Sequence, residues 1–170
     1  MNVWQLKKAT DEIIRDYNDE VLNILESLQE DISELNREQL SKGITSDGKK
    51  IGDKPPFNHP YYFPGHYAHR VEKGLEVGFI NLKWSGKFYD SIFTEVKNRN
   101  VTIFSNDDRS KVNALMYGGS SGLKSLCGCT RVREGGFGEQ IFGLTNENKT
   151  KIRDIVKNRL NQWAINKLKQ

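Results

Sequence analysis

The sequence predicts a single α+β domain in which helices cover one face of a small antiparallel sheet. Three observations support this fold class. Residues 3–40 form a long amphipathic stretch with no proline or glycine, residues 77–105 are rich in β-branched and aromatic residues with polar turns, and a second amphipathic stretch begins near residue 145. A chain of 170 residues fits one domain with one modest core, so residues 1–170 are expected to fold together.

The first helix is expected to span residues 3–40 without interruption. Apolar side chains recur at three- and four-residue spacing from Ile14 through Val21 to Leu28, and Gly43 follows as a stop signal. A helix of this length is about 55 Å long, more than a domain of this size can cover. We therefore expect part of its stripe, with Val21 and Leu28 as candidates, to meet another helix or another subunit. The alternative is an ordinary core helix whose first turns fray.

Residues 41–78 are expected to be irregular. Asp47-Gly48 is a turn signal, and prolines then punctuate an aromatic-rich loop that cannot lie inside a sheet. Exposed aromatic side chains are typical of partner-binding surfaces. We therefore take as candidate interface residues Tyr61, Tyr62 and Phe63. The alternative is a loop that folds over its own core.

The sheet is expected within residues 77–105 as a three-stranded antiparallel meander. Its strands are expected at residues 77–84, 88–96 and 100–105, and the second could begin with a helical turn. A short helix is expected at residues 107–117. Its expected N-cap is Asn106 or Asp107, and its inward side chains are Val112, Leu115 and Met116.

Residues 118–143 hold eight of the fifteen glycines, a density that disfavours a fixed backbone. We expect a flexible loop or arm that becomes ordered on assembly, although a plain surface loop has the same composition. The arm is basic and carries one aromatic side chain. Its candidate interface residues are Lys124, Arg131, Arg133 and Phe137.

The final helix is expected to begin at Thr145, with Leu144 packing against its first turn. Its apolar stripe contains Ile152, Val156, Leu160, Trp163 and Leu168.

The net charge of +4 is unevenly distributed. Residues 2–40 contain ten acidic and four basic side chains, whereas residues 145–170 contain two acidic and seven basic ones. Opposite charges of this kind attract, so the two terminal helices are expected to pair within one subunit or between neighbours. The alternative is two independently solvated faces.

Bulk features exclude several classes of protein. No apolar run approaches the roughly 20 residues that span a bilayer, and the first ten residues lack the apolar region of a signal peptide, so we expect no membrane contact and synthesis in the cytoplasm. Cys127 and Cys129, one residue apart, are too few and too close to form a disulfide framework.

A zinc site is the sharpest chemical hypothesis. The chain has donors at His59, His66, His69, Cys127 and Cys129. The Cys-x-Cys spacing is tighter than in common zinc sites, and polar loop histidines with incidental thiols are the simpler interpretation. No nucleophile elbow and no phosphate loop is present.

One block resembles a known family. Residues 81–92, Asn-Leu-Lys-Trp-Ser-Gly-Lys-Phe-Tyr-Asp-Ser-Ile, follow a polar Ser-Asp-Gly-Lys-Lys-Ile-Gly segment at residues 46–52. The pattern resembles virion-morphogenesis proteins of tailed bacteriophages, the small tail-completion or head-tail connector (neck) class. In those proteins a long first helix and a polar Asp-Gly loop precede a block of leucine, two residues, a small residue, glycine, one residue, an aromatic, two residues, serine and isoleucine. The resemblance covers about residues 35–120.

The resemblance implies a non-enzymatic structural protein, with no catalytic residues and no cofactor, that is made in the host cytoplasm and resides in the virion. It implies a ring homo-oligomer, with portal- or adaptor-side and tail-side virion proteins as further partners and non-specific contact with genomic DNA. Trp84 and Phe88 are expected in the core, because strand aromatics near a tight turn usually pack inward.

Two alternatives belong to other classes. The sequence pI of about 9.0 and the basic final helix fit a nucleic-acid-binding module. The second alternative, a zinc-dependent enzyme or a metal-stabilised domain, is less favoured than the nucleic-acid-binding module.

Overall fold

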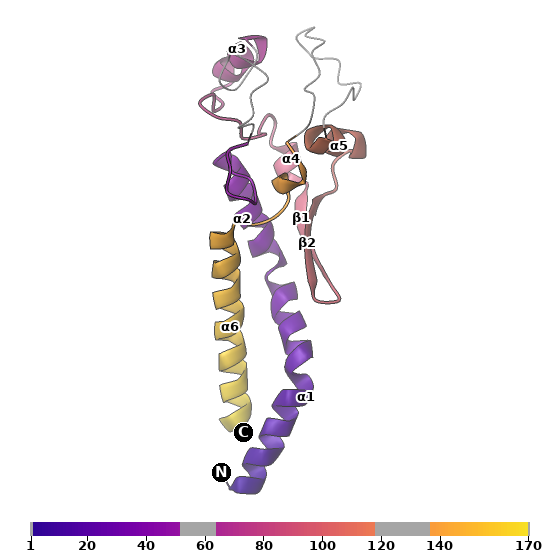
Figure 1. Cartoon of the computed structure of the whole chain (residues 1–170), viewed down its shortest axis with the longest axis vertical. Helices are drawn as coiled ribbons and strands as arrows, with labels where there is room; N and C mark the ends of the chain where they lie inside the picture. Colours follow the sequence, from indigo (N-terminus) through magenta and orange to yellow (C-terminus); the bar gives the residue numbers. More distant parts are fainter. Residues whose placement is uncertain (1, 52–63, 118–136, 170) are drawn as a thin grey trace.

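A computed structural model describes residues 2–51, 64–117 and 137–169, and it confirms the α+β class. Within these ranges the chain forms a long N-terminal helical region, a two-stranded antiparallel sheet and a C-terminal helix (Figure 1). In chain order the elements are α1 (Val3–Ser27), α2 (Gln29–Ser41), α3 (Pro64–Glu72), α4 (Lys87–Asp90), β1 (Ile92–Lys97), β2 (Asn100–Ser105), α5 (Arg109–Tyr117), the 3-10 helix η1 (Glu139–Ile141) and α6 (Asn146–Lys169).

The first helical region divides at Leu28, so the expectation of one uninterrupted helix is wrong at that residue. Leu28 has φ −101° and ψ 4°, and its N–H donates to the carbonyl of Leu25 at 3.1 Å, the tighter bond of a 3-10 turn. The break changes the direction of the chain, so that α1 packs on α6 while α2 packs on β1. Gly43 has φ +70°, which confirms the predicted stop signal after α2.

β1 and β2 form a hairpin in which Ile92 faces Ser105 and Phe93 faces Phe104. The connecting residues Asn98 and Arg99 both have positive φ, 51° and 64°, as in the two-residue turns that match the twist of a hairpin. The strand expected at residues 88–96 starts later than predicted, because α4 occupies its first residues.

The strand expected at residues 77–84 is absent from the described sheet. The segment is irregular there because side chains, and not a neighbouring strand, bind its backbone. The guanidinium of Arg70 donates to the carbonyl of Lys83 at 2.8 Å, and the hydroxyl of Tyr89 donates to the carbonyl of Asn81. Leu82 has φ +56°, which breaks the extended conformation that a ladder needs.

The short helix α5 begins at Arg109, and its first turn is capped by the carboxylate of Asp108, which accepts from the N–H of Lys111 at 3.0 Å. The expected cap at Asn106 or Asp107 is therefore wrong by at least one residue. Where the described chain resumes, the N–H of Phe137 donates to the carbonyl of Leu115 at 2.6 Å. Phe137 thus lies beside the last turn of α5.

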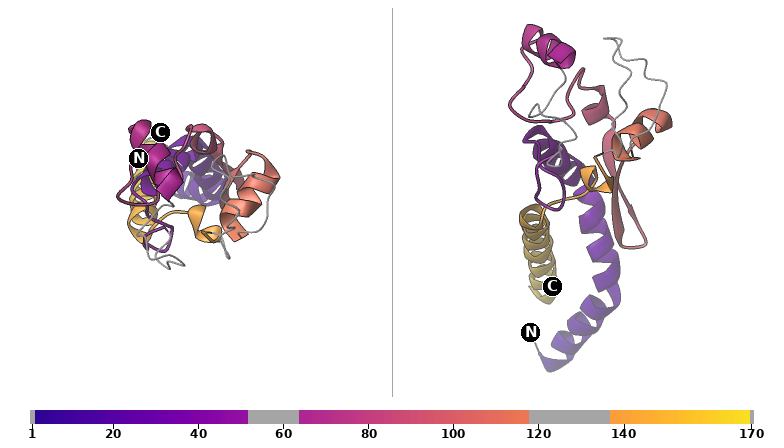
Figure 2. Two further views of the ribbon diagram at one scale, coloured as in Figure 1. Left: turned by 90° about the horizontal axis from the view of Figure 1, so that it is seen from above. Right: turned by 45° about the horizontal axis from the view of Figure 1, so that its top comes forward.

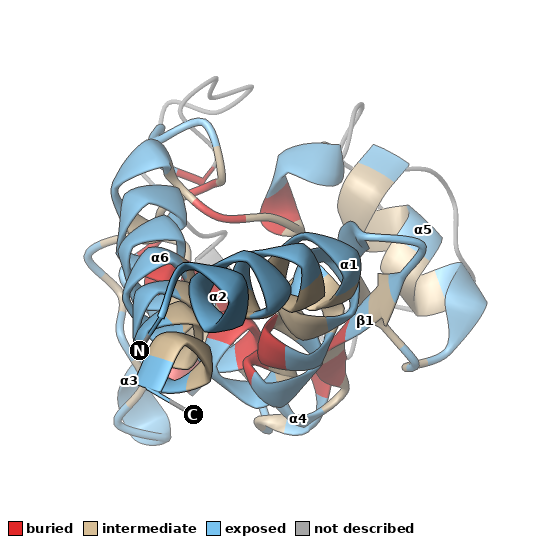
Figure 3. Cartoon of the chain, turned by 90° about the horizontal axis from the view of Figure 1, so that it is seen from below, coloured by how far each residue is buried: buried red, intermediate tan, exposed pale blue. Residues whose placement is uncertain are grey.

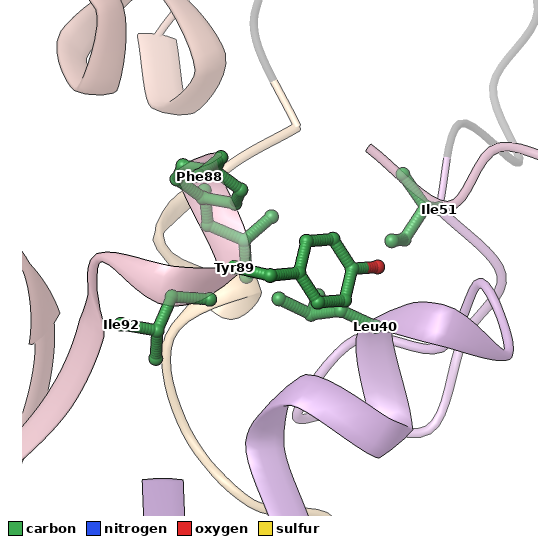
Figure 4. Packing of buried hydrophobic residues seen from close by; sticks show 6 residues of the cluster. Leu40, Ile51, Phe88, Tyr89 and Ile92 are labelled. Carbon is green, nitrogen blue, oxygen red and sulfur yellow. The ribbon is translucent and has the colours of Figure 1, made fainter. Parts of the chain in front are cut away.

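Two apolar clusters form the core. The first joins α2, the turn at Ile51, α4, β1 and η1 through Leu40, Ile51, Phe88, Tyr89, Ile92 and Ile141. Figure 4 shows how Leu40, Ile51, Phe88, Tyr89 and Ile92 come together. The second joins α1, α2 and α6 through Ile24, Leu28, Ile32, Leu144 and Ile152. Each aliphatic side chain buried here stabilises the fold by about 1.5–3 kcal/mol.

The helices α1 and α6 lie side by side, and both chain termini lie at the same end of the molecule (Figure 1). The rotated view in Figure 2 shows the same pairing, with α3 and the hairpin away from the termini. α1 therefore begins at an end of the molecule where few other elements are present to cover it.

Candidate assembly surface

The pairing of α1 with α6 brings the acidic and basic ends of the sequence together within one chain. The ammonium of Lys167 lies 3.5 Å from the carboxylate of Asp16, and the guanidinium of Arg159 donates to the hydroxyl of Ser27 at 2.7 Å. The pKa of Asp16 lies below its ordinary value, chiefly because its carboxylate accepts a hydrogen bond from Arg15 and also interacts with Lys167. Intramolecular attraction between the terminal helices is thus observed.

The first turns of α1 expose apolar side chains. Trp4 is 73% exposed and Ile14 is 69% exposed, and Val3 and Leu6 are also exposed. Because Lys167 near the end of α6 is level with Asp16, the turns of α1 before Asp11 project beyond the end of α6 (Figure 1). Seen from below in Figure 3, the nearest turns of α1 are mostly pale blue, the colour of exposed residues. We therefore take the start of α1 as a candidate contact surface.

A groove of about 370 Å³ lies beside this exposed helix. The groove is lined by Ile13 and Tyr17 of α1 and by one face of α6: Arg153, Val156, Lys157, Leu160, Asn161, Trp163 and Ala164. Its two basic side chains lie in the half nearer the start of α6, and Trp163 and Ala164 lie nearer its end. Arg153 and Lys157 form no ion pair with another described residue.

The resembling block at residues 81–92 comprises the irregular segment before α4, α4 itself and the connection to the first residue of β1. Gly86 has φ +87° and is the N-cap of α4, a left-handed position that favours glycine. Phe88 and Ile92 are buried, and the hydroxyl of Ser91 donates to the carbonyl of Phe88 at 2.6 Å. The predicted core position of Phe88 is confirmed, whereas Trp84 is half-buried.

Arg37 of α2 fixes this connection to the first helical region. Its guanidinium donates to the carbonyls of Tyr89 at 3.1 Å and Ile92 at 2.6 Å, and it pairs with Glu30 at 2.6 Å. Although partial burial opposes its charge, its pKa is raised, because hydrogen bonds to Glu30 and Glu34 stabilise the charged form. The block thus has a structural role at the centre of the fold.

Several interface candidates have a different environment from the expected one. Leu28 is fully buried between α1, α2 and α6, so it meets another helix of the same chain and is not available to a second copy. Val21 is half-buried, and Phe137 packs against the first core cluster. The other candidates lie outside the described residues: Tyr61, Tyr62, Phe63, Lys124, Arg131 and Arg133.

The two described histidines do not converge. The ring of His66 stacks on Trp84 with centroids 5.4 Å apart, and Nδ1 of His69 lies 3.4 Å from the carboxylate of Glu72. Burial lowers the pKa of His66, and the charges of Arg70 and His69 lower it further. Within the described ranges, no group of three or more His, Cys, Asp or Glu side chains could hold a metal ion. His59, Cys127 and Cys129 lie outside those ranges.

Sequence reasoning missed the exposed start of α1, because it began the apolar stripe at Ile14, although it placed the start of the helix at residue 3. The signal was present: Asn2 and Gln5 form a capping box in which the N–H of Gln5 donates to the side chain of Asn2 at 2.8 Å. This cap fixes the first turn and with it the exposed positions of Val3 and Trp4.

Comparison with protein-family models, with curated proteins and with solved structures gives no match for this chain. None of the helices in the described ranges is both long enough and apolar enough to cross a membrane.

Proposed function

We propose that this chain is a non-enzymatic structural protein of a tailed-phage virion that forms or joins a ring at the head-tail connector, in the neck or tail-completion position. The observation that carries the proposal is the block at residues 82–92. Its glycine takes a left-handed conformation, its aromatic residue and isoleucine are buried, and its serine closes the turn. The spacing of the block therefore serves a specific helix-to-strand connection.

Self-association is supported by the apolar surface that one copy leaves uncovered. Trp4 and Ile14 of α1 are exposed, and a groove with apolar walls runs along α6. Large apolar side chains are costly to keep in water, so their exposure favours an assembly partner.

Under this proposal the partners are further copies of the chain together with portal- or adaptor-side and tail-side virion proteins. Genomic DNA passing through the ring would make non-specific contacts. The protein would be synthesised in the host cytoplasm and would reside in the virion.

The proposal is tested by light scattering across a wide concentration series, followed by negative-stain imaging and zinc analysis of the same sample. A discrete oligomer that images as a ring and contains no metal supports it. A monomer at every concentration contradicts self-driven ring formation. Stoichiometric zinc contradicts the absence of a cofactor.

A nucleic-acid-binding module is the second candidate, because α6 carries seven basic and two acidic side chains. Arg153, Lys157 and Lys149 are exposed on it. Phosphate contacts release counterions, so binding to short DNA duplexes would fall steeply as salt increases. Tight, salt-dependent binding by the monomer would favour this function over the connector.

A further inference from the structure

We propose that the exposed start of α1 in one copy docks in the α6 groove of a second copy, and that this head-to-tail contact builds the oligomer. The two surfaces are defined as the α1 arm, residues 3–12, and the α6 groove, residues 153–164. The inference rests on the proposed function and deepens it by naming the contact that assembles the ring.

The lengths of the two surfaces agree. A helix of ten residues is about 15 Å long, and the twelve residues of the groove span about 17 Å at the same rise per residue. The arm projects beyond the end of α6 of its own chain, so a neighbour can reach it without a change in the fold (Figure 1).

The chemistry of the two surfaces also agrees, and it fixes their relative direction. Trp4 and Asp11 are seven residues apart and therefore share one face of the arm, with Lys7 and Lys8 between them, whereas Leu6 lies on the opposite face. Along α6 the groove begins with Arg153, Val156 and Lys157 and ends with Trp163 and Ala164. When the arm runs antiparallel to α6, Trp4 meets the apolar end of the groove and Asp11 meets its basic end.

In that orientation the arm places Trp4 near Trp163 and Ala164, and Asp11 near Arg153 and Lys157. None of these three charged groups forms an ion pair with another described residue. Docking would therefore cover the exposed indole of Trp4 and would bring Asp11 to two cations that form no ion pair in the described part of one copy.

The contact is heterologous, because the arm and the groove are different surfaces. A heterologous contact that repeats closes into a ring when the rotation between copies permits it, and otherwise produces an open filament. A two-fold dimer would require the same surface on both copies, so the contact predicts a specific behaviour on mixing.

The test uses two full-length variants. The arm variant carries Trp4→Ala and Leu6→Ala, and the groove variant carries Arg153→Glu and Lys157→Glu. All four side chains are exposed, so neither variant is expected to lose its fold, and circular dichroism checks this. Matched controls alter exposed residues of α6 outside the groove: Ile165→Ala for the apolar change, and Lys149→Glu with Lys169→Glu for the charge reversal.

Sedimentation velocity measures the result. Each variant alone is expected to need at least about tenfold more protein to associate than the wild type, because loss of a central tryptophan or of paired charges typically costs more than 1.4 kcal/mol. Both controls are expected to associate like the wild type. An equimolar mixture of the two variants is expected to give a one-to-one dimer and nothing larger, because one arm and one groove remain intact.

Three results overturn the inference. If both variants keep the oligomer of the wild type, assembly uses another surface and the connector proposal stands without this contact. If the mixture gives no dimer, head-to-tail docking is wrong. If the wild type itself stays monomeric across the series, this contact and self-driven ring formation both fail.

Discussion

Arg70 of α3 is buried, although arginine is rarely found away from water without partners. Its guanidinium donates to the carbonyl of Glu76, the carbonyl of Lys83 and the side-chain oxygen of Asn81, at 2.8 to 2.9 Å. One planar side chain thus organises the irregular segment that composition alone predicts to be a strand.

Replacing Arg70 by methionine is expected to lower the free energy of unfolding by about 2–4 kcal/mol, because three acceptors lose their donor and remain partly buried. Arg70→Lys is expected to recover little of this, since one ammonium cannot reproduce the fork of donors. Urea denaturation measures both, with Arg109→Met at an exposed arginine as the control. A loss no larger than that of the control would show that the segment does not depend on Arg70.

Asp47 provides a test by pH. Hydrogen bonds from Lys49 and Thr45 hold the pKa of its carboxyl at about 2, below the ordinary 3.8. A carboxyl whose pKa is depressed by folding stabilises the fold above the unfolded pKa, and this contribution is lost as pH falls from 3.8 to about 2. NMR titration of the Asp47 carboxyl carbon should give a midpoint near 2. A midpoint near 3.8 would show that the Thr45–Asp47–Lys49 turn does not persist in solution.

Among the elements, the end of α2 has an unusually close contact with the segment after α3. A Cβ on Gly43 would lie 2.5 Å from the ring of Phe79 and 2.8 Å from the carbonyl of Ile80, whereas a Cβ on Gly48 would meet nothing within 4 Å. Both glycines have positive φ, +70° and +79°. The pair therefore separates backbone strain from steric overlap.

Gly48→Ala is expected to cost about 1–2 kcal/mol from its left-handed conformation alone. Gly43→Ala is expected to cost about 1–3 kcal/mol more, because overpacking adds to the same strain. Thermal or urea unfolding of the two variants measures the difference. Equal losses would mean that the ring of Phe79 moves away at little cost.

The helices and the hairpin could be predicted because their signals are local. The apolar stripe of α2, the β-branched residues of β1 and β2 and the stripe of α6 each follow the period of their element. The break at Leu28 could not be predicted, because no glycine or proline marks it. The segment at residues 77–84 has the composition of a strand, but distant side chains bind its backbone.

The sequence predicts that part of the first helix is exposed, but it does not predict which residues form the candidate surface. Excess helix length correctly indicated that part of the first helix would lie outside the core. Periodicity could not show which part, because Leu28 and Ile14 belong to the same stripe. The position of α6 determines which part of the stripe is buried, because α6 covers Leu28 and leaves the α1 arm exposed.

For the molecule as a whole, the α1 arm lies outside the two core clusters and ahead of the ion pair between Asp16 and Lys167. It should therefore contribute to assembly and not to the stability of one copy.

Deleting residues 2–10, so that Met1 precedes Asp11, is expected to leave the free energy of unfolding of the monomer within about 0.5 kcal/mol of the wild type, the usual range for changes far from the core. The same deletion should abolish the oligomer, because it removes Trp4 and Leu6. Urea unfolding at low protein concentration and sedimentation at high concentration measure the two effects separately. A deletion that unfolds the monomer would assign the arm to the fold, whereas one that leaves the oligomer intact would exclude it from the contact between copies.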